Sequence, residues 1–122
     1  MKRQKYHHYN NLHDENQSSI KLKKAKVARY LIDYKKAKNK LIYYDAISND
    51  ENNLEMEKLK LEKYIEYIDN VLEMLCKDSK VFIINEYIKN YNNKTWWKSS
   101  LNRSTYFKIR RSALDEFLMY AE

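Results

Sequence analysis

The chain of 122 residues contains neither glycine nor proline. Tight β-hairpins usually need glycine or Asn-Gly turns, and the loops that cradle nucleotide phosphates require glycine. The sequence therefore favours helices over sheets and excludes the usual nucleotide-binding loops. Asparagine is expected to take the left-handed turn positions instead, at residues 10–11, 49, 52–53 and 92–93.

Charge is the second constraint. The chain carries 24 lysine and arginine residues against 17 aspartate and glutamate residues, which gives a net charge of +7. Such an excess indicates a polyanionic partner without identifying it, because DNA-binding, RNA-binding and ribosomal proteins share this property. The length fits one domain, or a small domain with a helical extension, and permits a modest core.

The residues most often used for metal binding and redox chemistry are sparse. The single Cys76 cannot form a disulfide within the chain, which fits a reducing cytoplasm, and its apolar helical surroundings predict a packed thiol. His7, His8 and His13 lack the cysteine or carboxylate spacing of a metal site, so no metal and no cofactor is expected. No signal peptide is recognised and apolar runs are short, so no membrane association is expected.

The first part of the chain predicts a polar arm and one long helix. Residues 1–17 are polar and aperiodic, which is typical of a mobile or loosely docked arm. Residues 19–47 have helical periodicity, with Ser18 or Ser19 as the N-cap. Nine basic residues and one acid lie between Lys21 and Lys40, on either a solvated face or a second phosphate-contacting surface. The apolar stripe consists of Ile20, Val27, Tyr30, Tyr34, Ala37, Leu41 and Tyr44.

A turn at residues 48–53 leads to a second predicted helix at 54–77. Its apolar seam consists of Leu54, Leu61, Ile65, Ile68, Leu72 and Leu75, and its solvent-facing acids are Glu55, Glu57, Glu62, Glu66, Asp69 and Glu73. A basic helix and an acidic helix can pair as an antiparallel hairpin. Alternatively, each stripe pairs with another subunit. Residues 18–77 are therefore expected to form a long helical hairpin or an oligomerisation region.

Residues 78–122 predict a three-helix helix-turn-helix domain. A helix is predicted at 80–89, with Val81, Ile84 and Ile88 along one edge of its apolar surface and Phe82 and Ile83 adding to that surface. A loop at 90–94 and a short helix at 95–101 follow it. Asn102 is expected to cap a last helix at 103–120. The core face of this helix includes Tyr106, Ile109, Ala113 and Phe117, and is expected to pack on Trp97, Leu101 and the preceding helix.

Residues 94–114 hold six basic residues and no acidic one. A helix that enters a DNA major groove needs phosphate-neutralising cations, side chains that bond base edges and an apolar back face. Arg103 and Lys108 are the candidates for guanine O6 and N7, and Thr105 for a thymine methyl group. The candidate phosphate ligands are Lys94, Lys98, Arg110 and Arg111. At least one tryptophan is expected in the core, whereas Trp96 could rest against the DNA backbone.

The run from Asn102 to Phe117, with Ser104-Thr105-Tyr106-Phe107-Lys108-Ile109-Arg110 at its centre, resembles phage-type transcriptional regulators of the ArpU and RinA kind, including small mollicute relatives. That resemblance covers about the last third of the chain. It implies a sigma-region-4-like helix-turn-helix, sequence-specific binding to double-stranded DNA and control of transcription in the bacterial cytoplasm, in association with the nucleoid. The recognition positions that it implies are Arg103, Ser104, Thr105, Phe107 and Lys108.

The sequence also bears on functions other than sequence-specific DNA binding. No nucleophile-and-base arrangement, paired carboxylates in a cleft or cofactor loop is visible, so an enzyme is not expected. A sigma-like module can bind RNA polymerase instead of DNA, or together with it. Long helices can also oligomerise into an assembly or packaging module, as in small terminase subunits, and the basic first helix permits RNA binding. A homodimer is expected if the DNA target is an inverted repeat.

Overall fold

The computed structural model describes the backbone of residues 2–47 and 52–122 and the side chains of residues 19–47 and 54–122. Every regular element in these ranges is a helix. The elements are α1 (Lys2–Ile47), α2 (Asn52–Met74), α3 (Lys77–Ile83), the π-helix η1 (Ile84–Lys89) and α4 (Arg103–Ala121). The prediction of an all-α fold is therefore confirmed for the described part of the chain.

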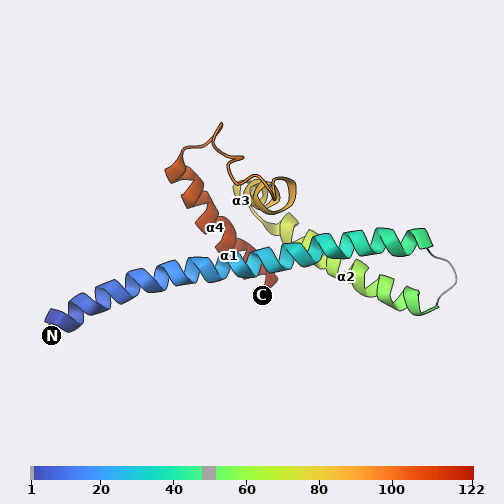
Figure 1. Cartoon of the computed structure of the whole chain (residues 1–122), viewed down its shortest axis with the longest axis horizontal. Coiled ribbons are helices and arrows are strands. Elements are labelled where there is room, and N and C mark those ends of the chain that lie inside the picture. The colour runs from blue at the N-terminus through green and yellow to red at the C-terminus, as the bar shows by residue number, and fades with distance from the viewer. Residues whose placement is uncertain (1, 48–51) are drawn as a thin grey trace.

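The C-terminal half of α1 lies beside α2, and the two helices run in opposite directions (Figure 1). Two tyrosine hydroxyls join them. Tyr34 donates to Asp69 Oδ1 at 2.5 Å, and Tyr64 donates to the backbone oxygen of Tyr30 at 2.8 Å. These bonds fix how far one helix slides along the other, because each links one residue of α1 to one of α2.

One hydrophobic cluster includes buried residues of α1, α2, α3 and α4. The predicted stripes contribute Val27, Tyr34, Ile68, Leu72 and Leu75 to it, and Tyr30 and Ile65 pack against it. The cluster also contains Leu31 and Val71, which the predicted stripes did not include. Leu31 follows Val27 by four residues and Val71 follows Ile68 by three, so both lie on the predicted apolar faces. Full burial of such a side chain stabilises the fold by about 1.5–3 kcal/mol. The cluster is continuous across residue 77, the expected boundary between the two parts of the chain.

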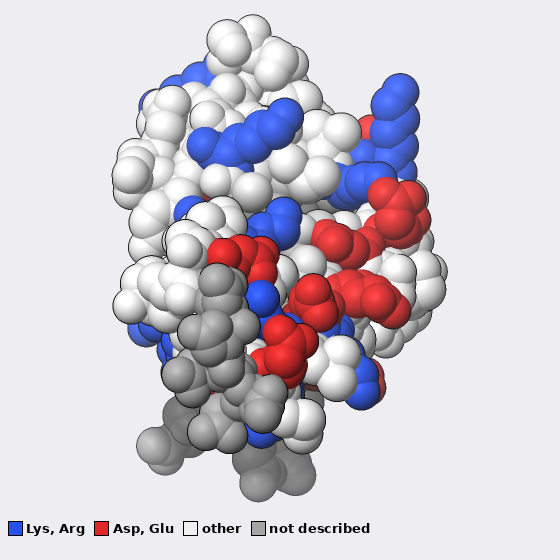
Figure 2. Space-filling view, turned by 90° about the vertical axis from the view of Figure 1, so that its right-hand side faces the viewer, with Lys and Arg blue, Asp and Glu red and all other residues white. Residues whose placement is uncertain are grey.

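Charge is divided between the surfaces of the molecule. The six carboxylates predicted to face solvent on α2 are all exposed. Figure 2 shows acidic side chains gathered in a band across one end of the molecule, whereas the upper part of that view carries mainly basic and uncharged side chains. Lys58 of α2 pairs with Asp45 of α1 at 2.9 Å. This pair joins a base of the acidic helix to an acid of the basic helix, which is the reverse of the predicted attraction.

The first helix is longer than predicted. It begins at Lys2, so Ser18 and Ser19 lie inside the helix and do not cap it. Without glycine or proline, residues 2–18 contain no strong helix breaker. Residues 2–17, which were expected to form a polar arm, are the first turns of this helix, and their side chains, including the three histidines, lie outside the described residues. The predicted turn at 48–53 lies outside them at residues 48–51, and its last two residues begin α2.

The third predicted helix begins earlier than expected and changes its winding. The α-helical part is Lys77–Ile83, and η1 follows without a break. The side-chain Nδ2 of Asn85 donates to the Val81 carbonyl at 2.9 Å. The backbone N–H of Asn90 donates to the Asn85 carbonyl at 2.9 Å, a bond that spans five residues. Val81 is 49% exposed, so its placement on the apolar surface was wrong, whereas Phe82 and Ile83 are buried.

Cys76 is exposed, which corrects the prediction of a packed thiol. The residue lies in the break between α2 and α3, where its extended backbone makes it the N-cap of α3. Its backbone N–H donates to Glu116 Oε1 at 2.8 Å, and its sulfur lies 3.4 Å from Ser79 Oγ. The side chain therefore lies at the start of a helix and not on the apolar face of a continuous helix.

Candidate nucleic-acid interface

One face of α4 anchors this helix in the core. Its buried residues are Tyr106, Ala113, Leu114, Phe117, Leu118 and Ala121. Asn102 Oδ1 accepts the backbone N–H of Thr105 at 2.8 Å, so the predicted N-cap is confirmed. The opposite side of the helix is left to solvent. A helix that is held in this way can present side chains outward from a fixed backbone.

Residues 90–102 connect η1 to α4 as a series of turns, and the predicted helix at 95–101 is wrong. Asn93 Oδ1 accepts the backbone N–H of Thr95 at 3.1 Å and its hydroxyl at 2.9 Å. The Trp97 carbonyl accepts the N–H groups of Ser100 at 3.0 Å and Leu101 at 2.8 Å. Side-chain bonds of this kind compete with a helical backbone.

The prediction that asparagines adopt the left-handed backbone conformation is also wrong within the described residues, because none of these asparagines has a positive φ. Asn93 shapes the connection through its side-chain oxygen instead, and the side-chain Nδ2 of Asn90 donates to Asn85 Oδ1 at 3.1 Å. Asparagine therefore replaces glycine here by hydrogen bonding, a second way in which it promotes turns.

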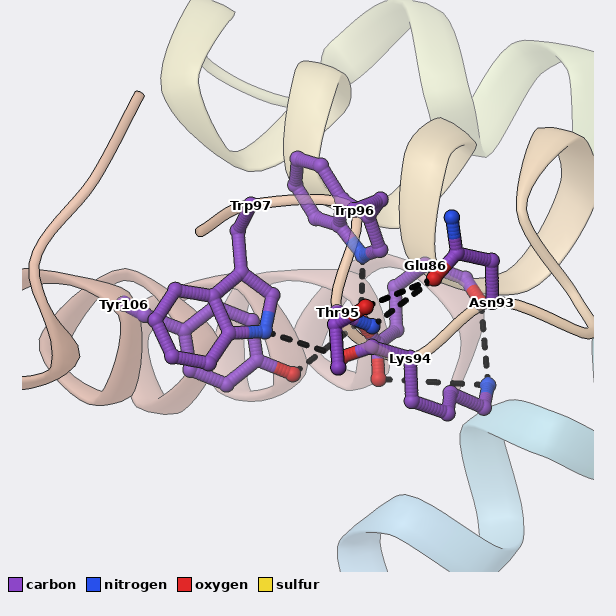
Figure 3. A network of polar contacts seen from close by, with 7 residues as sticks. All are labelled: Glu86, Asn93, Lys94, Thr95, Trp96, Trp97 and Tyr106. Atoms are coloured by element: carbon purple, nitrogen blue, oxygen red, sulfur yellow. Dashed lines mark hydrogen bonds and ion pairs between the residues drawn. The ribbon is translucent and has the colours of Figure 1, made fainter. Parts of the chain in front are cut away.

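Glu86 of η1 organises the connection (Figure 3). Its Oε1 accepts the indole N–H of Trp96 at 2.7 Å and the hydroxyl of Tyr106 at 3.0 Å. Lys94 Nζ lies 3.9 Å from Oε2 and donates to the Glu86 backbone oxygen at 3.1 Å. Glu86 is only 8% exposed, so these partners replace the water that a buried carboxylate loses.

Sequence analysis missed Glu86. It is the single acidic residue between Asp78 and Asp115, and that isolation in a basic region was a usable signal. Burial raises the pKa of Tyr106 well above its usual value, and the neighbouring Glu86 carboxylate acts in the same direction. Tyr106 therefore remains a neutral hydrogen-bond donor to Glu86 at ordinary pH.

The two tryptophans pack against the core. The ring of Trp97 stacks on that of Tyr106 with centroids 4.3 Å apart and an interplanar angle of 19°. Trp96 lies against Phe82, and both indoles are partly buried. Glu86 already accepts the Trp96 N–H, so this donor is not free to bind a DNA phosphate in the way that was considered from the sequence. The Trp97 N–H donates to the Lys94 carbonyl at 2.9 Å.

The candidate base-reading residues do not share one face. Arg103, Ser104, Phe107 and Lys108 are exposed, whereas Thr105 is partly buried. Thr105 follows Arg103 by two residues, about 200° around the helix, so the two side chains point in nearly opposite directions. The structure thus brings four of the five candidates to the accessible side of α4.

The candidate phosphate ligands differ in their surroundings. Lys98 and Arg111 are exposed, and neither pairs with a carboxylate of the described residues. Arg110 is half-buried, with its guanidinium 4.6 Å from the Phe107 ring centroid. Lys94 is already engaged by Glu86 and by the rings of Tyr87 and Tyr91. Lys98 and Arg111 are therefore the freer cations.

Helix α1 borders this surface. Ser19, Ile20 and Lys23 of α1 line a shallow pocket of about 100 Å³ together with Arg111 and Leu114 of α4. Two α1 lysines pair with acids near the end of the chain: Lys23 with Asp115 of α4 at 2.6 Å, and Lys26 with Glu122, the residue after α4, at 3.6 Å. The first pair neutralises a carboxylate one turn from Arg111 that would otherwise repel an anion there.

In the part of the chain that the structure describes, no three histidine, cysteine or carboxylate side chains gather as a possible metal site. None of the described helices combines the length and the apolar character needed to cross a membrane. Comparison with protein-family models gave no match. Searches of curated proteins and of solved structures gave none either.

Proposed function

We propose that this protein is a sequence-specific regulator of transcription that places the N-terminal half of α4 in the major groove of double-stranded DNA. The observation that carries the proposal is the set of exposed cations on that half-helix, Arg103, Lys108 and Arg111, none paired with a carboxylate of the described residues. A buried opposite face holds the helix in place. Unpaired cations on an anchored helix suit a groove lined by phosphates.

In this proposal α3–η1 and α4 act as the two helices of a helix-turn-helix, with residues 90–102 in place of a tight turn. Arg103 and Lys108 bond base edges, while Lys98 and Arg111 hold phosphates on either side. Glu86 and the Trp97–Tyr106 stack fix the start of α4 against η1. The role is one of binding without catalysis, and the proposed setting is the bacterial nucleoid.

The test is in-vitro selection from random duplex DNA at near-physiological salt, with wild type and Arg103→Ala in parallel. A recovered motif whose information decreases at one position in the variant supports the proposal, because a base-reading arginine carries specificity. Met119→Ala is the matched control, since Met119 is also exposed on α4 but near its other end. No motif, or the same weak bias from both proteins, would overturn sequence-specific reading.

A second candidate is an assembly role, including docking on RNA polymerase, through α2. Met56, Leu59, Tyr67 and Met74 are 62%, 46%, 39% and 51% exposed. Their spacing places them along one side of the helix, and an apolar stripe of this kind can pair with another protein. The mass of the protein in solution separates the options: a large ring favours packaging, whereas a monomer or dimer favours regulation.

A further inference from the structure

Phe107 lies between two guanidinium groups on the accessible side of α4. The Cζ atom of Arg110 is 4.6 Å from the ring centroid, and that of Arg103 is 5.5 Å away. The ring of Tyr106 packs edge-on against Phe107, with centroids 5.2 Å apart. Phe107 is nevertheless 37% exposed. An apolar ring is thus held in place on several sides and open to solvent on another.

The two arginines retain most of their hydrogen-bonding capacity. A guanidinium that lies over a ring makes this contact without using its five N–H donors, which can still bond other groups. Neither arginine pairs with a carboxylate of the described residues. The cluster therefore presents bidentate donors directly beside a hydrocarbon surface.

We propose that Arg103 and Phe107 read two neighbouring base pairs, a guanine and a thymine. Arg103 bonds guanine O6 and N7, the Phe107 ring contacts the thymine C5-methyl group, and Arg110 holds the ring and a phosphate. This inference rests on the proposed DNA-binding function.

The geometry favours adjacent pairs. Stacked bases are about 3.4 Å apart along a strand, and the guanidinium of Arg103 lies 5.5 Å from the centre of the phenyl ring. Guanine and the thymine methyl group are the major-groove features that arginine and phenylalanine match. Thr105 was the expected methyl contact, but it is partly buried and points away from Arg103. The phenylalanine replaces it in this role.

The experiment uses the duplex recovered by selection, with each thymine replaced in turn by uracil, which lacks only the methyl group. Wild type is expected to lose about fourfold in affinity at one thymine next to a guanine, the equivalent of about 0.8 kcal/mol for one buried carbon. Phe107→Ala is expected to bind the thymine duplex more weakly and to show no further loss with uracil. Met119→Ala is expected to retain the fourfold difference.

Wild-type affinity that is unchanged by uracil at every thymine would overturn the inference, as would a full fourfold effect that persists in Phe107→Ala. In either case the recovered motif would leave the proposed function standing. Failure to recover any motif would instead overturn the proposed function and this inference with it. The uracil series on wild type needs no variant, so it decides the question even if Phe107→Ala does not fold.

Discussion

The hydroxyl of Tyr106 donates a 3.0 Å hydrogen bond to Oε1 of Glu86, a residue twenty positions earlier in the chain. The same oxygen accepts the indole N–H of Trp96 at 2.7 Å. One carboxylate of η1 thus holds both the irregular connection and the first turn of α4. In addition to the buried face of α4, this oxygen and the stack of Trp97 on Tyr106 hold the N-terminal end of the helix in place.

Removal of the Tyr106 hydroxyl is expected to destabilise the fold without emptying the core. Tyr106→Phe should lower the free energy of unfolding by about 1.5–3 kcal/mol, the range for hydrogen bonds to charged groups. Tyr106→Ala should cost about 3–5 kcal/mol, because Tyr106 is 5% exposed and its ring would leave a cavity. Urea denaturation followed by tryptophan fluorescence measures both. Equal stability of Tyr106→Phe and wild type would show that the bond contributes nothing.

The N-cap of α4 makes a separate prediction. Asn102→Ala should lower the free energy of unfolding by about 1 kcal/mol, because the Thr105 N–H loses its side-chain acceptor. Asn102→Asp, which keeps an acceptor oxygen, is the matched control and should retain most of the stability. Thermal unfolding followed by circular dichroism makes the comparison. Identical melting curves for Asn102→Ala and wild type would rule out a capping contribution.

Tyr87 links stability to alkaline pH. Burial raises its pKa to about 12 from the ordinary 10.0, the Glu86 carboxylate acts in the same direction, and Arg110 acts against them. Below pH 10 both states keep the proton, so the pKa difference has no effect on stability. Between pH 10 and 12 the unfolded state ionises first, and the free energy of unfolding decreases. Urea denaturation across this window should show a shallower decrease for Tyr87→Phe, and parallel curves would contradict this origin.

The proposed roles of two cations are separable by their salt dependence. Lys98→Ala should weaken binding to all duplexes alike and reduce the slope of log affinity against log salt concentration by about one unit. Arg103→Ala should cost about 1–3 kcal/mol on the selected site and much less on random DNA. Fluorescence anisotropy with both duplexes at several salt concentrations measures this. If the two variants behave alike, the division between phosphate contact and base contact is wrong.

Periodicity predicted the paired parts of the two long helices because their apolar residues recur over many turns, although it missed the extension of α1 back to Lys2. Val27, Tyr34, Ile68 and Leu72 were all expected on the seam and are buried. The same reasoning applied to α4, whose core face and N-cap were both predicted. These features depend on local spacing, which the sequence displays directly.

The connection was not predictable in the same way, because its shape depends on a distant partner. Trp96, Trp97 and Leu101 suggested a short apolar helix, but the Trp96 N–H reaches Glu86, ten residues earlier, and Asn93 binds Thr95. Nothing in the spacing of residues 95–101 reveals that carboxylate. The opposed directions of Arg103 and Thr105, by contrast, follow from their spacing of two residues in the predicted helix, so the assignment of both to one face could have been corrected from the sequence.

Helix α1 packs against α2, η1 and α4, and its Leu31 belongs to the same buried cluster as Phe117 of α4. A substitution at Leu31 therefore disturbs the packing that all four α-helices share, including that of α4, which begins at Arg103. The N-terminal helices and the last helix cannot be exchanged independently between proteins, as separable modules can. Substitutions at the exposed positions of α4 leave this shared cluster intact, whereas substitutions at its buried positions also disturb the packing of α1 and α2.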